Sequence, residues 1–168
     1  MADAEAFGIA LDKVGAVKIY GSNIPFRVPA RTFVIDGTVA HPVLPFVQAL
    51  EKEKFQVTSG PGSSPITLRY GSLWKEFLSP GSIPSFMLPE KLQRWEMRIN
   101  VSIDVELDEH GNHALTITGN GFPTRGNDFL FDVVARAAEG FAQSGHLLHR
   151  TDFFQGDPNA VKPKATKK

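Results

Sequence analysis

Residues 97–108 read MRINVSIDVELD, and apolar and polar side chains alternate along the whole stretch. A period of two residues is typical of a β-strand with one face in a hydrophobic core and the other in water. Strands of a parallel sheet are buried on both faces and read as nearly continuous apolar runs. The alternation therefore predicts an antiparallel sheet at the centre of the fold.

A second strand is expected at residues 114–118, where Leu115 and Ile117 continue the apolar face of the first strand. Both apolar sets occupy odd-numbered positions. Two residues that lie opposite each other must therefore have numbers whose sum is even, because an odd sum would place apolar side chains of one strand opposite polar side chains of the other. A three-residue loop at 110–112, or a five-residue loop of the same parity, meets this condition, and a two-residue turn does not. We therefore predict a long hairpin over about residues 97–118.

A long helix is expected over about residues 128–149, because apolar side chains recur there at intervals of three and four residues. Asn127 or Asp128 is expected to cap its start. His146 and His149 would then fall in its last turn, at the negative end of the helix dipole. The predicted fold class is α+β, a mainly antiparallel sheet built around the hairpin and packed by this C-terminal helix.

Shorter elements are expected before the hairpin, from the spacing of apolar residues and the positions of proline and glycine. Strands are predicted at residues 16–20, 31–35, 55–58 and 66–70, and helices at 1–15, 41–54 and 72–78. Residues 79–89 are apolar and contain three prolines, which indicates a loop that covers a core, since a linker would be more polar.

The chain has 168 residues, with 18 acidic and 18 basic side chains. This length is enough for one domain that buries a core without disulfides or metal. We expect a single α+β domain over residues 1–156. Residues 157–168 are rich in lysine and contain two prolines, which predicts a flexible basic tail.

Several classes of protein are disfavoured by composition. The chain has no cysteine, which excludes disulfides, thiolate zinc sites and cysteine nucleophiles. Its start lacks the basic and apolar segments of a signal peptide, and no run of eighteen apolar residues occurs, so a cytoplasmic protein without membrane contact is the default expectation. With zero net charge, only the lysine tail could attract nucleic acid, and we expect no such partner.

A glycine-rich segment at residues 119–126 reads GNGFPTRG and joins a predicted strand to the long helix. Backbone N–H groups at a helix start can bind a phosphate or carboxylate, so Gly119, Gly121, Arg125 and Gly126 are candidate ligand-binding residues. The glycine spacing differs from that of the dinucleotide and Walker motifs. The favoured interpretation is a strand-to-helix turn whose glycines adopt left-handed conformations.

Asp36 follows a predicted strand, and His41 comes five residues later. A carboxylate bonded to a histidine serves general-base and triad chemistry, which makes this pair the candidate catalytic residues. The sequence contains no G-x-S-x-G elbow to supply a nucleophile. The favoured interpretation is a turn at Asp36 and a helix start at His41, and the sequence leaves open whether the protein is an enzyme.

The predicted hairpin tip offers four possible metal ligands in six residues, namely Asp108, Glu109, His110 and His113. Neighbouring side chains on a tight hairpin leave on opposite faces and rarely converge on one ion. We therefore expect a solvated turn, and neither a metal site nor a cofactor.

Two apolar pairs are candidate interaction residues: Phe86 and Met87 in the proline-rich loop, and Phe153 and Phe154 after the long helix. The second pair could instead plug the core, which is the favoured interpretation. The favoured function is a non-catalytic interaction or assembly module, which binds another protein or a second copy of itself through a sheet edge or apolar loop. The alternative is a small enzyme or a binding protein for a small anionic ligand, with its site between sheet and C-terminal helix.

Overall fold

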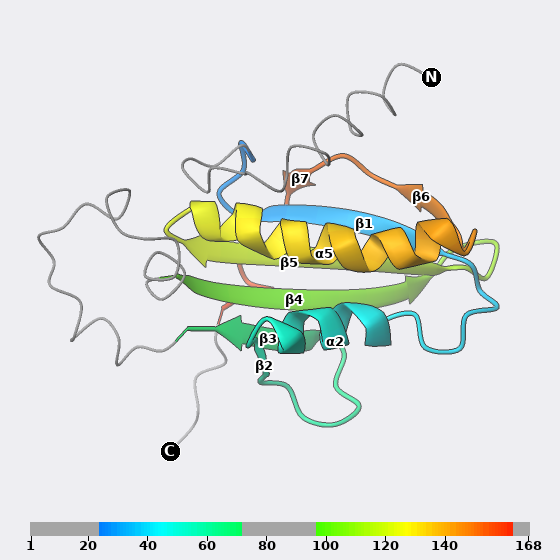
Figure 1. Ribbon diagram of the computed structural model, residues 1–168, viewed down its shortest axis with the longest axis horizontal. Helices are drawn as coiled ribbons and strands as arrows, with labels where there is room; N and C mark the ends of the chain where they lie inside the picture. Colours follow the sequence, from blue (N-terminus) through cyan, green and yellow to red (C-terminus); the bar gives the residue numbers. More distant parts are fainter. Residues whose placement is uncertain (1–23, 72–96, 163–168) are drawn as a thin grey trace, which may run out of the picture.

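The computed structural model describes residues 24–71 and 97–162, which form one antiparallel sheet and two helices (Figure 1). The strands are β1 (Pro29–Ile35), β2 (Gln56–Val57), β3 (Ile66–Tyr70), β4 (Arg98–Leu107), β5 (His113–Phe122), β6 (Leu147–Arg150) and β7 (Phe154–Gln155). The helices are α2 (Leu44–Lys52) and α5 (Arg125–Gln143). The predicted elements at 1–20 and 72–95 lie outside the described residues.

The sheet has the order β2-β3-β4-β5-β1-β6, and β7 also pairs with β1. Every pairing is antiparallel. Both helices lie on the same side of the sheet in Figure 1, with α5 along β5 and α2 beside it, toward β3. The predicted fold class, an α+β protein with an antiparallel sheet packed by a long C-terminal helix, is confirmed.

The register of the central hairpin keeps the predicted parity, because Val105 lies opposite Leu115. The loop between the strands has five residues, the longer of the two expected lengths. The Asp108 carboxylate explains this choice, since its Oδ1 accepts the backbone N–H groups of His110 and Asn112, both at 2.8 Å.

The hydrophobic core fills the space between the sheet and the two helices. The largest fully buried side chains are Phe33, Ile35, Phe46, Leu50, Leu68, Met97, Ile99, Ile103, Leu115, Ile117 and Leu130. On β4 and β5 these are the odd-numbered residues of the predicted apolar face. The apolar stripe of α5 is buried against them, so this helix covers the sheet as expected.

The end of α5 corrects the predicted helix at 128–149, because the helix stops at Gln143. Gly145 has a φ of 76°, and its N–H donates to the carbonyl of Ala142 at 3.1 Å. The N–H of His146 donates to the carbonyl of Phe141 at 2.8 Å. This pair of bonds is the Schellman motif, which ends a helix at a left-handed glycine.

The residues beyond this helix end turn back to the sheet as the strand β6, which pairs with β1. His149 therefore lies in a strand, and His146 in the turn before it, rather than in a last helical turn. At the other end, α5 begins at Arg125 after the N-cap residue Thr124, so the predicted capping by Asn127 or Asp128 is also wrong.

The face of the sheet that points away from the helices carries the even-numbered residues of β4 and β5, which are mostly polar. The chain after β7 crosses this face behind β5 and β4 (Figure 1). We call residues 156–162 the C-terminal strap. The N–H of Gly156 donates to the carbonyl of Val28 at 2.7 Å, and a Cβ at Gly156 would lie 2.7 Å from Thr118 and 3.0 Å from Ala30. Val161 in the strap is buried. The domain division at residue 156 stays a prediction.

Candidate functional site

An apolar groove of about 620 Å³ lies between the start of α2 and the loop that joins β2 to β3. The helix side is formed by Ala40, His41, Pro42, Val43, Leu44 and Val47. The opposite side is formed by Val57, Ile66 and residues 59–63. We call this feature the α2 groove.

Helical periodicity explains why α2 presents apolar residues to both the core and the groove. Phe46 and Leu50 are four residues apart, share one face of the helix and are fully buried. Leu44 and Val47 then fall on another face, which lines the groove. Leu44 is 47% exposed, and Val57 across the groove is 42% exposed. The two walls of the groove therefore leave apolar surface in contact with water.

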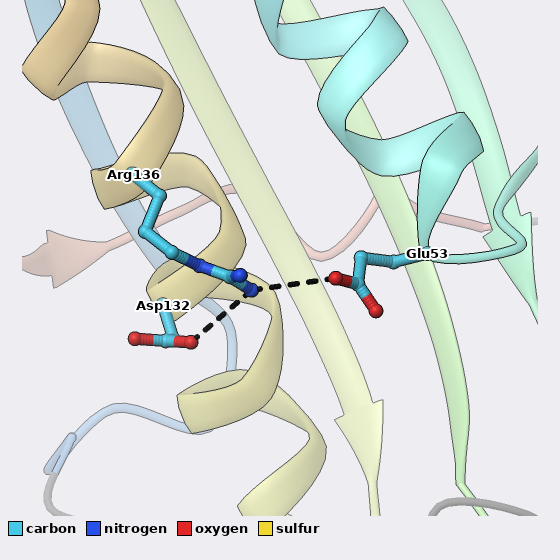
Figure 2. A network of polar contacts seen from close by, with 3 residues as sticks. All are labelled: Glu53, Asp132 and Arg136. Carbon is cyan, nitrogen blue, oxygen red and sulfur yellow. Dashed lines mark ion pairs between the residues drawn. The ribbon is translucent and has the colours of Figure 1, made fainter. Parts of the chain in front are cut away.

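Helix α2 is held in place by its contacts with α5. The ring of Phe46 stacks on Phe141 with 5.7 Å between centroids. Arg136 of α5 reaches across to Glu53, just past the end of α2, at 3.5 Å, and contacts Asp132 on its own helix at 3.4 Å (Figure 2). The Arg136 side chain is about half exposed, so the ion pairs add little beside the aromatic contact.

The strand β2 borders the groove, and among residues 24–71 and 97–162 it is the outermost strand on its side of the sheet. Val57 lies opposite Leu68, and the next residue, Thr58, donates its N–H to the carbonyl of Thr67 at 2.8 Å. In an antiparallel pair, hydrogen-bonded and non-hydrogen-bonded residues alternate. The backbone N–H and C=O of Val57 therefore point away from β3, toward the open edge beside the groove.

The described lining of the groove carries almost no charge. Among the lining residues within 24–71 and 97–162, only His41 has an ionisable side chain. Ser59 and Ser63 supply hydroxyl groups, and the Ser59 hydroxyl already accepts the N–H of Thr67 at 3.2 Å. Because an unpaired charge is costly on an apolar surface, this lining favours an uncharged occupant.

Asp36 and His41 are placed by the structure in different local environments. The Oδ1 atom of Asp36 accepts the N–H of Thr38 at 2.8 Å and its hydroxyl at 2.7 Å. His41 lines the groove, and its carbonyl accepts the N–H of Leu44 at 3.3 Å. Within residues 24–71 and 97–162, no hydrogen bond joins the two side chains. This geometry agrees with a turn at Asp36 and a helix start near His41.

The pKa of the Asp36 carboxyl group lies below its ordinary value of 3.8, first because of the N–H of Thr38 and second because of the Thr38 hydroxyl. The ionised carboxylate therefore stabilises the folded state above pH 4, and this contribution is lost as the pH falls through the lowered pKa.

We expect Thr38→Ala, which keeps the N–H, to raise the Asp36 pKa part of the way toward 3.8. An NMR titration of the Asp36 carboxyl group measures this change in pKa. The control Ser63→Ala should leave the Asp36 titration unchanged, and an identical curve for Thr38→Ala would contradict the assignment.

Most of the glycine-rich segment at 119–126 belongs to regular structure, and only Pro123 and Thr124 form the turn between strand and helix. Gly119 and Gly121 lie in β5, and Gly126 lies in the first turn of α5. None of the three has a positive φ, so the expected left-handed conformations are absent at these positions. The reason for glycine is instead the close approach of α5 to β5. A Cβ on Gly119 would overlap the side chain of Leu130, and one on Gly121 would lie 2.7 Å from the backbone nitrogen of Asn127.

The N–H groups that could have cradled an anion are used within the chain. Gly126 donates to the carbonyl of Pro123 at 2.8 Å, and Asn127 donates to that of Thr124 at 2.9 Å. The N–H of Gly121 is bonded at 2.7 Å to Oδ1 of Asn127, whose side chain is fully buried. Arg125 is buried at the start of the helix. The predicted residues thus lie close together, but their amides stabilise the junction of strand and helix.

The aromatic pair after α5 is divided between the interior and the surface. The ring of Phe153 meets Phe131 edge-on with 5.0 Å between centroids, and the guanidinium of Arg31 lies 4.9 Å from its centre. Phe154 pairs with Ala30 at the sheet edge and is partly exposed. Phe153 therefore behaves as a plug. The other predicted pair, Phe86 and Met87, lies outside the described residues.

At the hairpin tip, the Asp108 carboxylate accepts hydrogen bonds from backbone N–H groups of the loop. The pKa of this carboxyl group is lowered, mainly by the N–H of Asn112. In the described part of the chain, no group of three or more histidine and acidic side chains could hold a metal ion. Among these residues, no helix is long and apolar enough to cross a membrane.

A serine and histidine pair that was not a sequence candidate lies at the end of α5, where Ser144 Oγ is 2.9 Å from His146 Nδ1. The Ser144 hydroxyl also lies 3.1 Å from the carbonyls of Gly140 and Phe141. These contacts belong to the C-terminal end of a helix, whose negative partial charge opposes a developing oxyanion. The pair therefore fits a helix cap better than a nucleophile and its base.

The chain matches no protein-family model, no curated protein and no solved structure. Functional inference therefore depends on the geometry of the described residues.

Proposed function

We propose that the protein is a non-catalytic binding module that takes an apolar, uncharged segment of another polypeptide into the α2 groove. The observation that carries this proposal is the exposed apolar lining of the groove, with Leu44 on one wall and Val57 on the other. Exposed apolar surface that is gathered in one concave place marks interaction sites more often than scattered apolar residues do.

Two further observations support a binding role over a catalytic one. The candidate pair Asp36 and His41 shares no hydrogen bond in the described part of the chain, and the amides of the glycine-rich segment are used internally. Side chains of α5 such as Leu130 and Val134 are buried in the core cluster, which favours the α2 groove over the space between sheet and α5 as the binding site.

A small uncharged apolar molecule is the second candidate for the same groove. Its volume of about 620 Å³ falls within the range of small-molecule pockets, ~300–1,000 Å³. An anionic ligand is less well supported, because the described lining residues include no lysine or arginine. A second copy of the chain as occupant and a cytoplasmic location also remain proposals.

The test is selection of random heptapeptides by the immobilised protein, followed by affinity measurements on the selected peptides. We expect enrichment of apolar, uncharged sequences, and at least a tenfold loss of affinity for Leu44→Lys, because the lysine ammonium would be placed on the apolar wall. The matched control is Leu107→Lys, at a position that is 69% exposed and is not among the residues that line the groove.

Equal affinity of the two lysine variants, or no enrichment of apolar peptides, would refute a polypeptide partner in this groove. A thermal-shift screen with small uncharged apolar compounds then tests the second candidate. Light scattering tests the third, since a dimer that dissociates in Leu44→Lys but not in Leu107→Lys would identify a second copy as the occupant.

A further inference from the structure

The edge of β2 offers backbone hydrogen-bonding groups beside the α2 groove. The N–H and C=O of Val57 point away from β3, as the pairing of Val57 with Leu68 and the Thr58 N–H bond to Thr67 require. An outermost strand with such groups is a template for pairing with another chain. By contrast, the N–H of the next residue, Thr58, points toward β3 and donates to the carbonyl of Thr67.

The apolar wall and the open edge lie next to each other, because Val57 belongs to both. Its side chain lines the groove, and its backbone forms the edge. In β-strand addition, main-chain hydrogen bonds hold an extended segment while every second side chain enters a pocket. In the described part of the lining His41 is the single ionisable residue, so the segment that matches it carries no charge on the side chains that face the groove.

We propose that the partner segment binds in an extended conformation as an additional strand at the edge of β2, with its backbone paired to Val57 and alternate apolar side chains in the α2 groove. This inference rests on the proposed function, because it specifies how a polypeptide would occupy the same groove. The length of β2 limits the pairing, since this strand has only two residues. The side chains in the groove therefore supply most of the affinity, and the backbone sets the direction of the segment.

The experiment is an N-methyl scan of a heptapeptide selected by the wild-type protein. N-methylation removes one backbone donor at a time without changing the side chain. An added strand directs alternate N–H groups toward β2 and the others toward solvent. We expect a loss of affinity of about fivefold where the methylated N–H faces Val57, and little loss at the residues on either side. On the protein, Val57→Pro removes the matching outward donor, which a proline at a sheet edge tolerates.

The expected result for Val57→Pro is a loss of affinity of about fivefold for the unmethylated peptide. The matched control is Val57→Thr, which keeps the backbone donor and the β-branched shape. Circular dichroism establishes that both variants are folded. A uniform loss along the N-methyl scan, without alternation, would indicate a helical segment and overturn strand addition. If Leu44→Lys still abolished binding in that case, the proposed function would survive. Failure of the selection itself would overturn both.

Discussion

Replacement of Phe46 by alanine is expected to lower the free energy of unfolding by about 4 kcal/mol. Phe46 is fully buried, and its ring lies 5.5 Å from the Phe33 centroid on β1 and 5.7 Å from that of Phe141 on α5. Phe46 thus joins α2 both to the sheet and to the second helix. Removal of the ring leaves a cavity among residues that cannot all move to fill it.

Urea denaturation followed by circular dichroism measures this effect. The control is Phe122→Ala, because Phe122 is 70% exposed and its loss should change stability by less than about 0.5 kcal/mol. Similar losses for the two variants would contradict the packing of α2 described above. Where Phe46→Ala remains folded, we also expect weaker peptide binding, since the α2 wall of the groove loses its anchor.

Replacement of Gly121 by alanine is expected to cost about 3 kcal/mol, a large effect for one methyl group. The added Cβ would lie 2.7 Å from the nitrogen of Asn127 and 2.8 Å from the carbonyl carbon of Gly126. Both are backbone atoms in the first turn of α5, so no side chain can rotate to make room. The helix would have to move away from β5, which would also stretch the Asn127 bond to the Gly121 N–H.

The matched control is Gly140→Ala in the same helix, where a Cβ would have nothing within 4 Å. Alanine has the higher helix propensity, so this variant should gain about 0.5–1 kcal/mol. The two glycine variants are therefore expected to change stability in opposite directions. Equal effects in urea denaturation would show that the close contact between β5 and α5 does not determine the choice of glycine at Gly121.

The sheet was predictable because its pattern is local. Alternation over residues 97–107 is visible within one strand, and the parity of Leu115 and Ile117 then restricts the register. The end of α5 was predicted wrongly, because the spacing of apolar residues alone does not mark where a helix stops. Its apolar spacing continues past Gln143, whereas the helix ends at the left-handed Gly145, where the Schellman bonds to Ala142 and Phe141 form.

The candidate site could not be predicted, because it depends on contacts between distant parts of the chain. Leu44 and Val57 are unremarkable apolar residues in sequence, and they form a groove only when α2 packs on Phe141 and the loop at 59–63 folds back toward it. The glycines of β5 illustrate the same limit. Their identity suggested anion binding or turns, but the structure shows that they are small because a helix lies on them.

The C-terminal strap has a practical consequence for any binding assay. It carries the chain onto the polar side of the sheet, whereas α2 and its groove lie on the helical side. A biosensor tether attached after the strap should therefore orient the molecule with the groove toward the solution. Immobilisation by this route should leave the recognition surface accessible, whereas coupling through the surface lysines near α2, Lys52 and Lys54, should obstruct it.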